Sequence, residues 1–335
     1  MDLFVSGDVF LDIVFTGLPR LPRPGEETWA PGMGSSPGGI ANLAVAAARL
    51  GLNTGLGAAF STDAYGEFCR EVLREQGIDL GPSRCFADWH SPVTVSLAYE
   101  RDRSMITHGH PAPVGADGLV GELPAATAAA VSLTGGRQAW VRRAARAGTL
   151  VFANVGWDDT AAWPAAALDL LEDCHAFLPN AVEAMRYTRT ATPREALHRL
   201  AERVPLAVVT CGADGALAID AATGQVASAP AVPVEALDPT GAGDVFNAGF
   251  IAATLWGLPL RQRLVFANLV AALSVRHFGG SLSAPGWADI AAWWGAQRPG
   301  PLGGEYGFLE DLIPAGDLRL ARRAGATIDR LPDAA

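Results

Sequence analysis

The sequence of 335 residues contains no lysine, so every basic side chain apart from six histidines is an arginine. This absence excludes three kinds of chemistry: phosphate binding by a P-loop lysine, nucleotide positioning by the strand lysine of protein kinases, and Schiff-base formation. Any bound anion has to be stabilised through backbone N–H groups, arginine or a metal ion instead.

Positive charge is scarce overall, because 25 arginines face 35 acidic residues and the net charge is −10. No basic stripe is visible, which argues against a nucleic-acid partner. Apolar runs such as Leu43–Ala48 stop at an arginine, far short of a membrane span. The first residues show neither a basic region nor a cleavage site, so we expect no signal peptide, no membrane association and a cytoplasmic location.

Cysteine is also rare. The four cysteines are far apart and form no C-x-x-C pair, so we expect buried, reduced thiols; they are Cys69, Cys85, Cys174 and Cys211.

Half of the residues are hydrophobic, which is enough for a large core in one domain or two. Short apolar runs alternate with alanine-rich helical stretches, a pattern typical of βαβ units and a mostly parallel sheet. The runs predict strands at 3–5, 149–153, 176–178, 206–210 and 215–219. The stretches predict helices at 41–50, 65–76, 194–203 and 264–277.

Two segments, Ile13–Thr28 and Pro92–Ile106, break this alternation because they are rich in β-formers separated by polar turns. Near the end, Arg298–Gly304 has the proline and glycine content of a linker, and Leu318–Leu331 is expected to form one helix that packs on its own domain.

Residues 238–247 read Asp-Pro-Thr-Gly-Ala-Gly-Asp-Val-Phe-Asn and are the most informative part of the chain. Glycines without a Cβ let backbone N–H groups converge on an anion, and the apolar helix that follows aims its free N–H groups at the same point. We expect Gly241, Ala242 and Gly243 to form an anion hole for a phosphoryl group. Asp244 then lies in the first helical turn, where a carboxylate can orient an attacking hydroxyl and accept its proton.

This segment resembles the signature of the ribokinase family of sugar kinases, also called PfkB-type. Further motifs of that family occur in the family's order between about residues 3 and 290, at Ser6–Asp12, Pro22–Glu26, Gly38–Asn42, Thr62–Gly66, Pro179–Glu183 and Thr210–Gly215. The resemblance implies a three-layer α/β/α fold with a mostly parallel central sheet and a small β-sheet lid. It also implies a kinase domain at 1–297, with lid segments at about 13–35 and 91–110, followed by a C-terminal extension at 298–335.

The resemblance assigns sugar binding to Asp12, Gly38, Gly39 and Asn42. We expect Asp12 to end the first strand, at the sheet edge where ligands bind in open α/β sheets. Asn42 offers both a donor and an acceptor to hydroxyl groups. Asp63 either takes part in this site or braces a loop.

Nucleotide and metal sites follow from the same resemblance. Thr210, Gly212 and Gly215 match the nucleotide loop, and Asn268 falls where the family contacts adenine. Asn180 and Glu183, three residues apart, share one helix face and can hold hydrated Mg²⁺; an exposed capping pair is the alternative. A K⁺ site of some members aligns with Asp238, Thr240, Ser274, Gly279 and Ser283.

The match departs from ribokinase itself in several places. Pro37 replaces the first glycine of the usual run, and Phe10 stands where ribokinase has a polar residue. The stretch Ala129–Leu133 lacks an acidic residue that ribokinase uses against its sugar. Arg101 and Arg103 either reach an acidic sugar or lie in a solvated loop.

We therefore expect ATP-dependent phosphorylation of the hydroxymethyl group of a small sugar. The expected cofactors are ATP and Mg²⁺, and K⁺ is a further candidate. A nucleoside kinase of the same fold, acting on a ribose 5′-hydroxyl, remains open, and so does a homodimer formed through the lid. A non-catalytic sugar or nucleotide sensor is disfavoured because it needs no base. A Rossmann oxidoreductase is disfavoured because Asp8–Asp12, and not G-x-G-x-x-G, follows the first strand.

Overall fold

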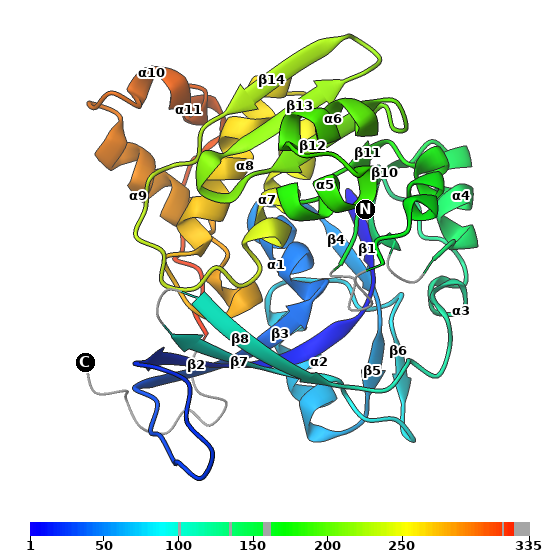
Figure 1. Cartoon of the computed structure of the whole chain (residues 1–335), viewed down its shortest axis with the longest axis vertical. Coiled ribbons are helices and arrows are strands. Elements are labelled where there is room, and N and C mark those ends of the chain that lie inside the picture. Colours follow the sequence, from blue (N-terminus) through cyan, green and yellow to red (C-terminus); the bar gives the residue numbers. More distant parts are fainter. Residues whose placement is uncertain (100–101, 134–135, 157–161, 317, 325–335) are drawn as a thin grey trace.

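The computed structural model describes residues 1–99, 102–133, 136–156, 162–316 and 318–324. An eight-stranded sheet forms the centre, with strand order β14-β13-β12-β11-β10-β9-β1-β4, and helices cover both of its faces (Figure 1). A four-stranded sheet lies below one end of this arrangement in the order β3-β2-β7-β8. The chain therefore has the three-layer α/β/α architecture with a small accessory sheet that the sequence predicts.

Most of the central sheet is parallel. Its parallel strands are β1 (Leu3–Ser6), β4 (Thr54–Gly57), β9 (Ala128–Ser132), β10 (Leu150–Asn154), β11 (Ala176–Phe177) and β12 (Leu206–Thr210). An antiparallel edge is added by β13 (Ala216–Asp220) and β14 (Gln225–Ala229). Parallel strands bring their carboxyl ends to one edge of the sheet, which is where ligands bind in folds of this kind.

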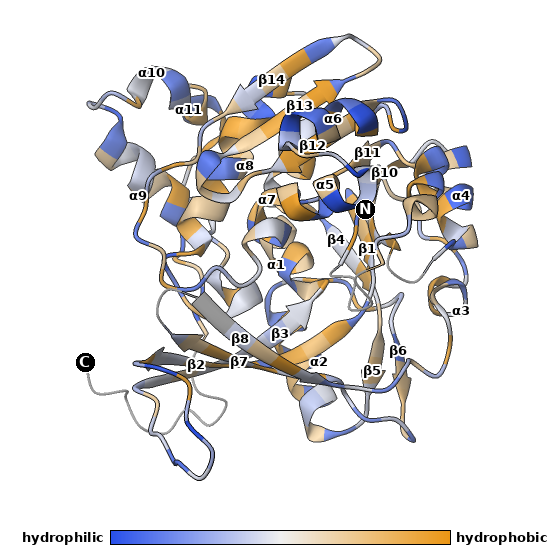
Figure 2. Cartoon of the chain, viewed as in Figure 1, coloured by the Kyte–Doolittle hydropathy of each residue, from blue (hydrophilic) through white to orange (hydrophobic). Residues whose placement is uncertain are grey.

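Two apolar cores lie on opposite faces of the central sheet, because alternate residues of each strand point to opposite sides. Leu3 and Val5 of β1 belong to one core, whereas Phe4 belongs to the other. The inner strands of the central sheet are accordingly mostly hydrophobic, whereas the edge strand β14 also carries polar residues (Figure 2).

The first core is covered by α1 (Ala41–Arg49), α2 (Ala64–Glu75), α7 (Ala242–Leu255), α8 (Leu260–Ser274) and α9 (Trp287–Gln297). The second core is covered by α4 (Ala139–Arg146), η2 (Ala165–Asp173), α5 (Ala181–Thr188) and α6 (Pro193–Ala201). Shorter helical segments complete the fold, namely α3 (Ala116–Val120), η3 (Gly212–Asp214), η4 (Gly280–Ser283), α10 (Gly303–Tyr306) and α11 (Leu309–Leu312).

The accessory sheet, which we call the lid, consists of β2 (Val9–Leu18), β3 (Gly32–Gly39), β7 (Val93–Tyr99) and β8 (Asp102–His108). A separate parallel pair is formed by β5 (Ala59–Ser61) and β6 (Arg84–Phe86). The two segments that break the strand and helix alternation in the sequence thus supply lid strands. The strand β3 was not predicted, because its sequence Gly-Met-Gly-Ser-Ser-Pro-Gly-Gly is poor in strand formers.

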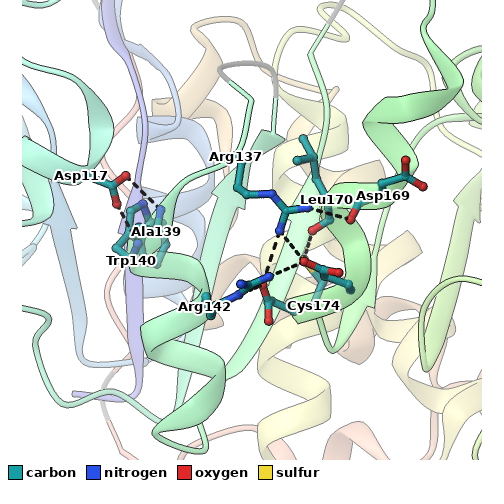
Figure 3. A network of polar contacts seen from close by, with 10 residues as sticks. Asp117, Arg137, Ala139, Trp140, Arg142, Asp169, Leu170 and Cys174 are labelled. Carbon is teal, nitrogen blue, oxygen red and sulfur yellow. Dashed lines mark hydrogen bonds and ion pairs between the residues drawn. The ribbon is translucent and has the colours of Figure 1, made fainter.

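An ion-pair network joins α4 to η2 on the face remote from α7 (Figure 3). Apart from this network, the carboxylate of Asp117 accepts from the N–H groups of Ala139 and Trp140 at 2.9 and 2.7 Å and so caps α4. Arg142 donates to Asp173 at 3.0 Å and also pairs with Glu172. These groups are partly exposed, so each pair contributes at most about 1 kcal/mol, and the network mainly fixes how α4 lies on the sheet.

The C-terminal part packs back on the rest of the fold. Residues 318–324 form no regular element, so the helix expected at 318–331 is wrong for this half, and the other half lies outside the described residues. Arg323 pairs with Asp289 at 2.6 Å, and Ala324 packs on Val72 and Leu282. The division into a kinase domain and an extension at residue 297 stays a prediction.

Candidate active site

The turn before α7 has the conformation that a phosphate-binding corner requires. Gly241 is the N-cap of α7 with φ 75° and ψ 1°, a left-handed conformation that favours glycine. The N–H of Ala242 donates to Pro239 O at 3.2 Å, whereas the N–H groups of Gly243 and Asp244 have no acceptor within the part of the chain that the structure describes. A Cβ at Gly243 would meet nothing within 4 Å, and both Gly243 and Asp244 line a cavity. The expected anion hole is thus available at Gly243 and Asp244 more than at Ala242.

Asp244 is held by a residue that is distant in sequence. Asn42, at the start of α1, donates from Nδ2 to Asp244 Oδ2 at 3.0 Å. The Asp244 side chain is only partly exposed, and this burial raises its pKa to about 6, although the hydrogen bond from Asn42 opposes the shift. The carboxylate is therefore ionised at pH 7 and is a stronger base than an ordinary aspartate.

Asp12 does not end the first strand as expected. The strand β1 ends at Ser6, and Asp12 lies within β2 of the lid, because the chain continues from the central sheet into the lid after a two-residue break. Its side chain still reaches the predicted site. A Cβ added to Gly280 would lie 3.5 Å from Asp12 Oδ2, 3.4 Å from Ser36 Oγ and 3.2 Å from Asn42 Oδ1, so these three side chains surround the same point. We call Asp12, Ser36 and Asn42 the acceptor cluster, because Asp12 and Asn42 are expected to bind the sugar that accepts the phosphoryl group.

Asn42 links the acceptor cluster to the base. Its Nδ2 is bonded to Asp244, while its Oδ1 is buried with no hydrogen-bond partner among the described residues. A buried acceptor without a donor is costly, so a ligand hydroxyl that donates to it is stabilised. Gly38 and Gly39 lie beside this cluster, and a Cβ at Gly38 would fall 1.9 Å from Asp12 Oδ2, so glycine is required there.

Asn180 and Glu183 form a capping box at the start of α5. Asn180 N donates to Glu183 Oε2 at 2.9 Å, and Glu183 N donates to Asn180 Oδ1 at 3.0 Å. The two residues therefore do cap α5, but the cap uses only the Oε2 atom of Glu183. The pKa of Glu183 is raised to about 7, mainly by burial and in smaller part by the nearby Asp244 carboxylate, against the hydrogen bonds with Asn180, which lower it. Two carboxylates in this relation attract a divalent cation.

A cavity of about 220 Å³ brings these groups together. It is lined by Asn154, Val155, Leu178, Asn180, Glu183, Thr210, Pro239, Gly241, Ala242, Gly243, Asp244 and Asn247. Asn154 and Asn247 were not identified from the sequence, and Asn154 Oδ1 is buried without a partner in the described region. Two signals could have found them: Asn154 closes the strand β10, and Asn247 follows Asp244 by three residues on one helix face.

A second, more apolar cavity of about 500 Å³ adjoins the first and shares Thr210, Pro239, Ala242 and Gly243 with it. All four residues expected to bind nucleotide line it: Thr210, Gly212, Gly215 and Asn268. The remainder of the wall is largely Ala, Val and Pro, with Phe246 at the α7 side, which suits a flat heterocycle.

Asn268 has a structural task within this second cavity. Its Nδ2 donates to the carbonyl oxygens of Ala229 and Pro230 at 3.1 and 2.9 Å, so its amide N–H groups hold the 229–230 wall. Gly215 supports the same wall, since it has φ 91° and a Cβ there would lie 2.1 Å from Ala229 O. The expected contact with adenine would therefore be made by Asn268 Oδ1.

The residues aligned with a monovalent-cation site are only partly assembled as ligands. Asp238, almost fully buried, accepts from Thr240 N at 2.9 Å and from Gly279 N at 3.2 Å, and so ties two loops together. Thr240 Oγ1 is buried with no partner among the described residues, which leaves one oxygen free for a cation. Ser274 and Ser283 instead donate to Ala271 O at 2.8 Å and Gly280 O at 2.6 Å.

Asp63 braces a loop. It caps α2 by accepting from Gly66 N at 2.8 Å, and it accepts from Ser91 N and Oγ at 2.8 and 2.7 Å. Burial opposes ionisation, but these hydrogen bonds outweigh it and lower the pKa of Asp63. The lid is thereby fixed to α2 just before β7. Arg101 lies outside the described residues, and so does the side chain of Arg103.

The two cavities contain no basic side chain in their described walls, so charge on a bound phosphate meets backbone N–H groups and any bound metal. No group of three or more His, Cys, Asp or Glu in the described residues is arranged to hold a metal. In the same residues, no helix has the length and hydropathy of a transmembrane segment.

Known proteins resemble this chain over most of its length. The family model of the pfkB family carbohydrate kinases matches residues 19–287. A nucleoside kinase from Methanothermobacter thermautotrophicus is 29% identical over 89% of this chain and 98% of its own. An aminoimidazole riboside kinase from Salmonella typhimurium is 30% identical over 74% of this chain and 85% of its own.

Solved structures share the fold. Arabidopsis thaliana ribokinase complexed with ribose and ATP superimposes with a TM-score of 0.70, at 24% identity, over 87% of this chain and 97% of its own. The match of both sequence and fold, together with the corner at Gly241–Asp244, leads to one conclusion: this chain belongs to the pfkB family of carbohydrate kinases and is a sugar or nucleoside kinase.

Proposed function

We propose that this protein uses ATP to phosphorylate the hydroxymethyl group of a small sugar, with Asp244 as the general base. The observation that carries the proposal is the position of Asp244. Its carboxylate is bonded to the acceptor cluster through Asn42, and it borders the cavity that opens onto the apolar nucleotide slot. A hydroxyl held by the acceptor cluster and a phosphate held by the turn would meet at this carboxylate.

In the proposed reaction, Asp12 and Asn42 Oδ1 accept from hydroxyls of the sugar and fix its orientation. The hydroxymethyl oxygen attacks the terminal phosphorus of ATP and gives its proton to Asp244, and ADP leaves. The N–H groups of Gly243 and Asp244 face the phosphoryl oxygens and stabilise the charge that develops on them. Because phosphoryl transfer has a loose transition state, a base with a pKa of about 6 is sufficient.

ATP is proposed to lie with its base in the 500 Å³ slot between Gly215, Asn268 and Phe246, and with its phosphates over Gly243. The ATP in the Arabidopsis ribokinase structure supports this choice of nucleotide. Glu183, with Asn180 beside it, would hold Mg²⁺ through water, and Mg²⁺ would neutralise phosphate charge that no lysine is present to balance. Asp238, Thr240, Ser274, Gly279 and Ser283 are the candidate site for K⁺. Ser274 and Ser283 donate their hydroxyl protons to carbonyl oxygens, and their own oxygens keep lone pairs that can bind a cation.

A nucleoside kinase acting on the ribose 5′-hydroxyl is the second candidate, and the names of two relatives favour it. Both candidates use the same base and turn. Purified enzyme assayed for ADP release with ATP, Mg²⁺ and a panel of sugars and nucleosides separates them. Turnover of sugars that is lost in Asp244→Asn supports the proposal, whereas turnover of nucleosides alone contradicts the sugar assignment.

A further inference from the structure

A short C-terminal segment of this chain lies outside the family match. Residues 318–324, which we call the strap, come after residue 287, where the match to the family model ends. The strap runs from the region of α11 toward the lid (Figure 1). It forms neither helix nor strand, so its position depends on the contacts that it makes with the rest of the fold.

The strap contacts the segment Gly279–Ala284, which contains η4 and which we call the η4 loop. This loop forms one wall of the acceptor cluster, because a Cβ at Gly280 would lie 3.2 to 3.5 Å from the side chains of all three cluster residues. Ser36 of the cluster also donates from Oγ to Gly279 O at 2.8 Å. A shift of the η4 loop would therefore change the space in which the acceptor is expected to bind.

The end of the η4 loop is buried, and its backbone carbonyls need donors from elsewhere. Leu282, Ser283 and Ala284 are at most 2% exposed. Arg49 donates from Nη1 to Leu282 O at 3.1 Å and also to Ala284 O. Arg323 of the strap donates from Nη1 to Ser283 O at 2.9 Å and to Ala284 O at 3.2 Å. Two guanidinium groups thus supply the donors for three consecutive carbonyls.

Arg49 also joins the strap to the helix that carries Asn42. It is the last residue of α1, and it donates from Nε to Gln76 Oε1 at 2.8 Å and from Nη2 to Arg322 O at 2.6 Å. Burial lowers the pKa of Arg49 to about 10, and the positive charge of Arg323 lowers it further, so Arg49 stays charged at neutral pH. Arg323 in turn pairs with Asp289 at 2.6 Å.

Ala324 occupies the joint between the lid and the η4 loop. A Cβ at Gly279 would lie 2.2 Å from the Cβ of Ala324, and a Cβ at Gly34 of β3 would lie 3.4 Å from it. Ala324 is 8% exposed and packs with Val72 and Leu282. The absence of side chains at the two glycines therefore makes room for the strap, which contacts both parts of the acceptor site.

The strap does not reach the other parts of the site. Asp238 accepts from Gly279 N and Thr240 N, and neither bond involves a group of the strap. The described wall of the 500 Å³ nucleotide cavity includes no residue of the η4 loop or the strap. Loss of a strap contact is therefore expected to affect the acceptor and not ATP.

We propose that Arg323 and Ala324 of the strap, together with Arg49, are positioning residues that hold the η4 loop against the acceptor cluster and so set the affinity for the acceptor. This inference rests on the proposed kinase function. These residues act through Gly279 and Gly280. Without them the loop is less ordered before binding, and the acceptor has to order it at a cost in affinity.

The test compares Arg323→Ala with Arg322→Ala. The two arginines are neighbours on the strap, but the Arg322 side chain is exposed and pairs with Glu75 of α2. Arg322→Ala keeps the carbonyl to which Arg49 donates, so it is the matched control. Arg323→Lys keeps a cationic donor for Asp289 and the η4 carbonyls, and it tests for rescue.

Each full-length variant is assayed with ATP and Mg²⁺. The acceptor is the one that the wild type turns over best among D-fructose, D-ribose, myo-inositol, cytidine and adenosine. The KM for the acceptor, the KM for ATP and kcat are measured separately, and thermal unfolding checks that each variant is folded.

Arg323→Ala should raise the KM for the acceptor about three- to tenfold, while kcat and the KM for ATP change by less than about twofold. Arg323→Lys should restore part of the affinity, and Arg322→Ala should resemble the wild type. Should Arg323→Ala not fold, Arg323→Lys decides by the same comparison, with a smaller rise in the KM for the acceptor alone.

Three results would overturn the inference while the kinase function stands: an unchanged KM for the acceptor in the Arg323 variants, an equal rise in Arg322→Ala, or an equal rise in KM for both substrates. Absence of turnover by the wild type with every acceptor contradicts the proposed function itself, and this inference with it.

Discussion

Replacing Gly243 with alanine should separate catalysis from folding at the phosphate-binding turn. Gly243 is exposed, has no left-handed φ, and an added Cβ would meet nothing within 4 Å. Alanine is favoured over glycine in a helix by up to about 1 kcal/mol, so the free energy of unfolding should stay equal or rise. Because Gly243 lines the same cavity as Asp244, the methyl group would be added beside the space that we assign to the phosphate.

The cost to the reaction follows from the loss of amide contacts. Removing one preorganised donor from an anion hole lowers kcat by about 10²–10³-fold, which corresponds to about 2.7–4 kcal/mol. We therefore expect kcat/KM of Gly243→Ala to fall at least about 100-fold while its melting temperature does not decrease. Steady-state kinetics and thermal unfolding of the same preparations measure both quantities.

Two other glycines provide controls. Gly295→Ala, in α9, also places a methyl on an exposed helix with nothing within 4 Å, and it should leave kcat/KM unchanged. Gly241→Ala should instead cost about 1–2 kcal/mol of stability, because Gly241 has φ 75°. Wild-type kcat/KM in Gly243→Ala would refute the assignment of the phosphate to this turn.

Three further predictions concern the surrounding residues. Because the pKa of Asp244 is raised to about 6, kcat should fall about tenfold per pH unit below pH 6 as the base becomes protonated; a flat profile down to pH 5 contradicts this. Asn268→Ala leaves two carbonyls unpaired, so it should cost about 1–3 kcal/mol in denaturant unfolding and raise KM for ATP. Glu183→Gln keeps an oxygen that can accept from Asn180 N, so the melting temperature should hold while the Mg²⁺ concentration for half-maximal rate rises; an unchanged Mg²⁺ requirement removes Glu183 from the metal site.

Much of the fold could be predicted from local sequence. The strand at 206–210 is confirmed at both ends, and the predicted helix after Gly243 is confirmed as α7, because apolar periodicity and glycine placement are local signals. The strand β3 was missed because it depends on pairing with β2 over eight residues, which outweighs its glycines and proline. The placement of Asp12 was wrong for a related reason: nothing in the sequence marks the point after Ser6 where the chain leaves the central sheet for the lid.

The sequence motifs predicted part of the candidate site, whereas contacts that depend on the tertiary structure were not predicted. The 238–247 segment identified Asp244, but the bond from Asn42 spans 202 residues and only the fold reveals it. Asn154 lies outside the recognised motifs, and Asn247 ends the 238–247 segment without an assigned role; the place of both in the cavity depends on how β10 and α7 meet. The bonds from Asn268 to the 229–230 wall were likewise invisible to a position-by-position resemblance.

The most direct test of the account is the turnover of Asp244→Asn, measured together with ligand binding. This change keeps an oxygen that can accept from Asn42 but removes the base. We predict that kcat falls about 10²–10⁴-fold while calorimetric affinities for ATP and for the acceptor stay near those of the wild type. A kcat close to the wild-type value would contradict the claim that the carboxylate in the first turn of α7 accepts the proton of the attacking hydroxyl.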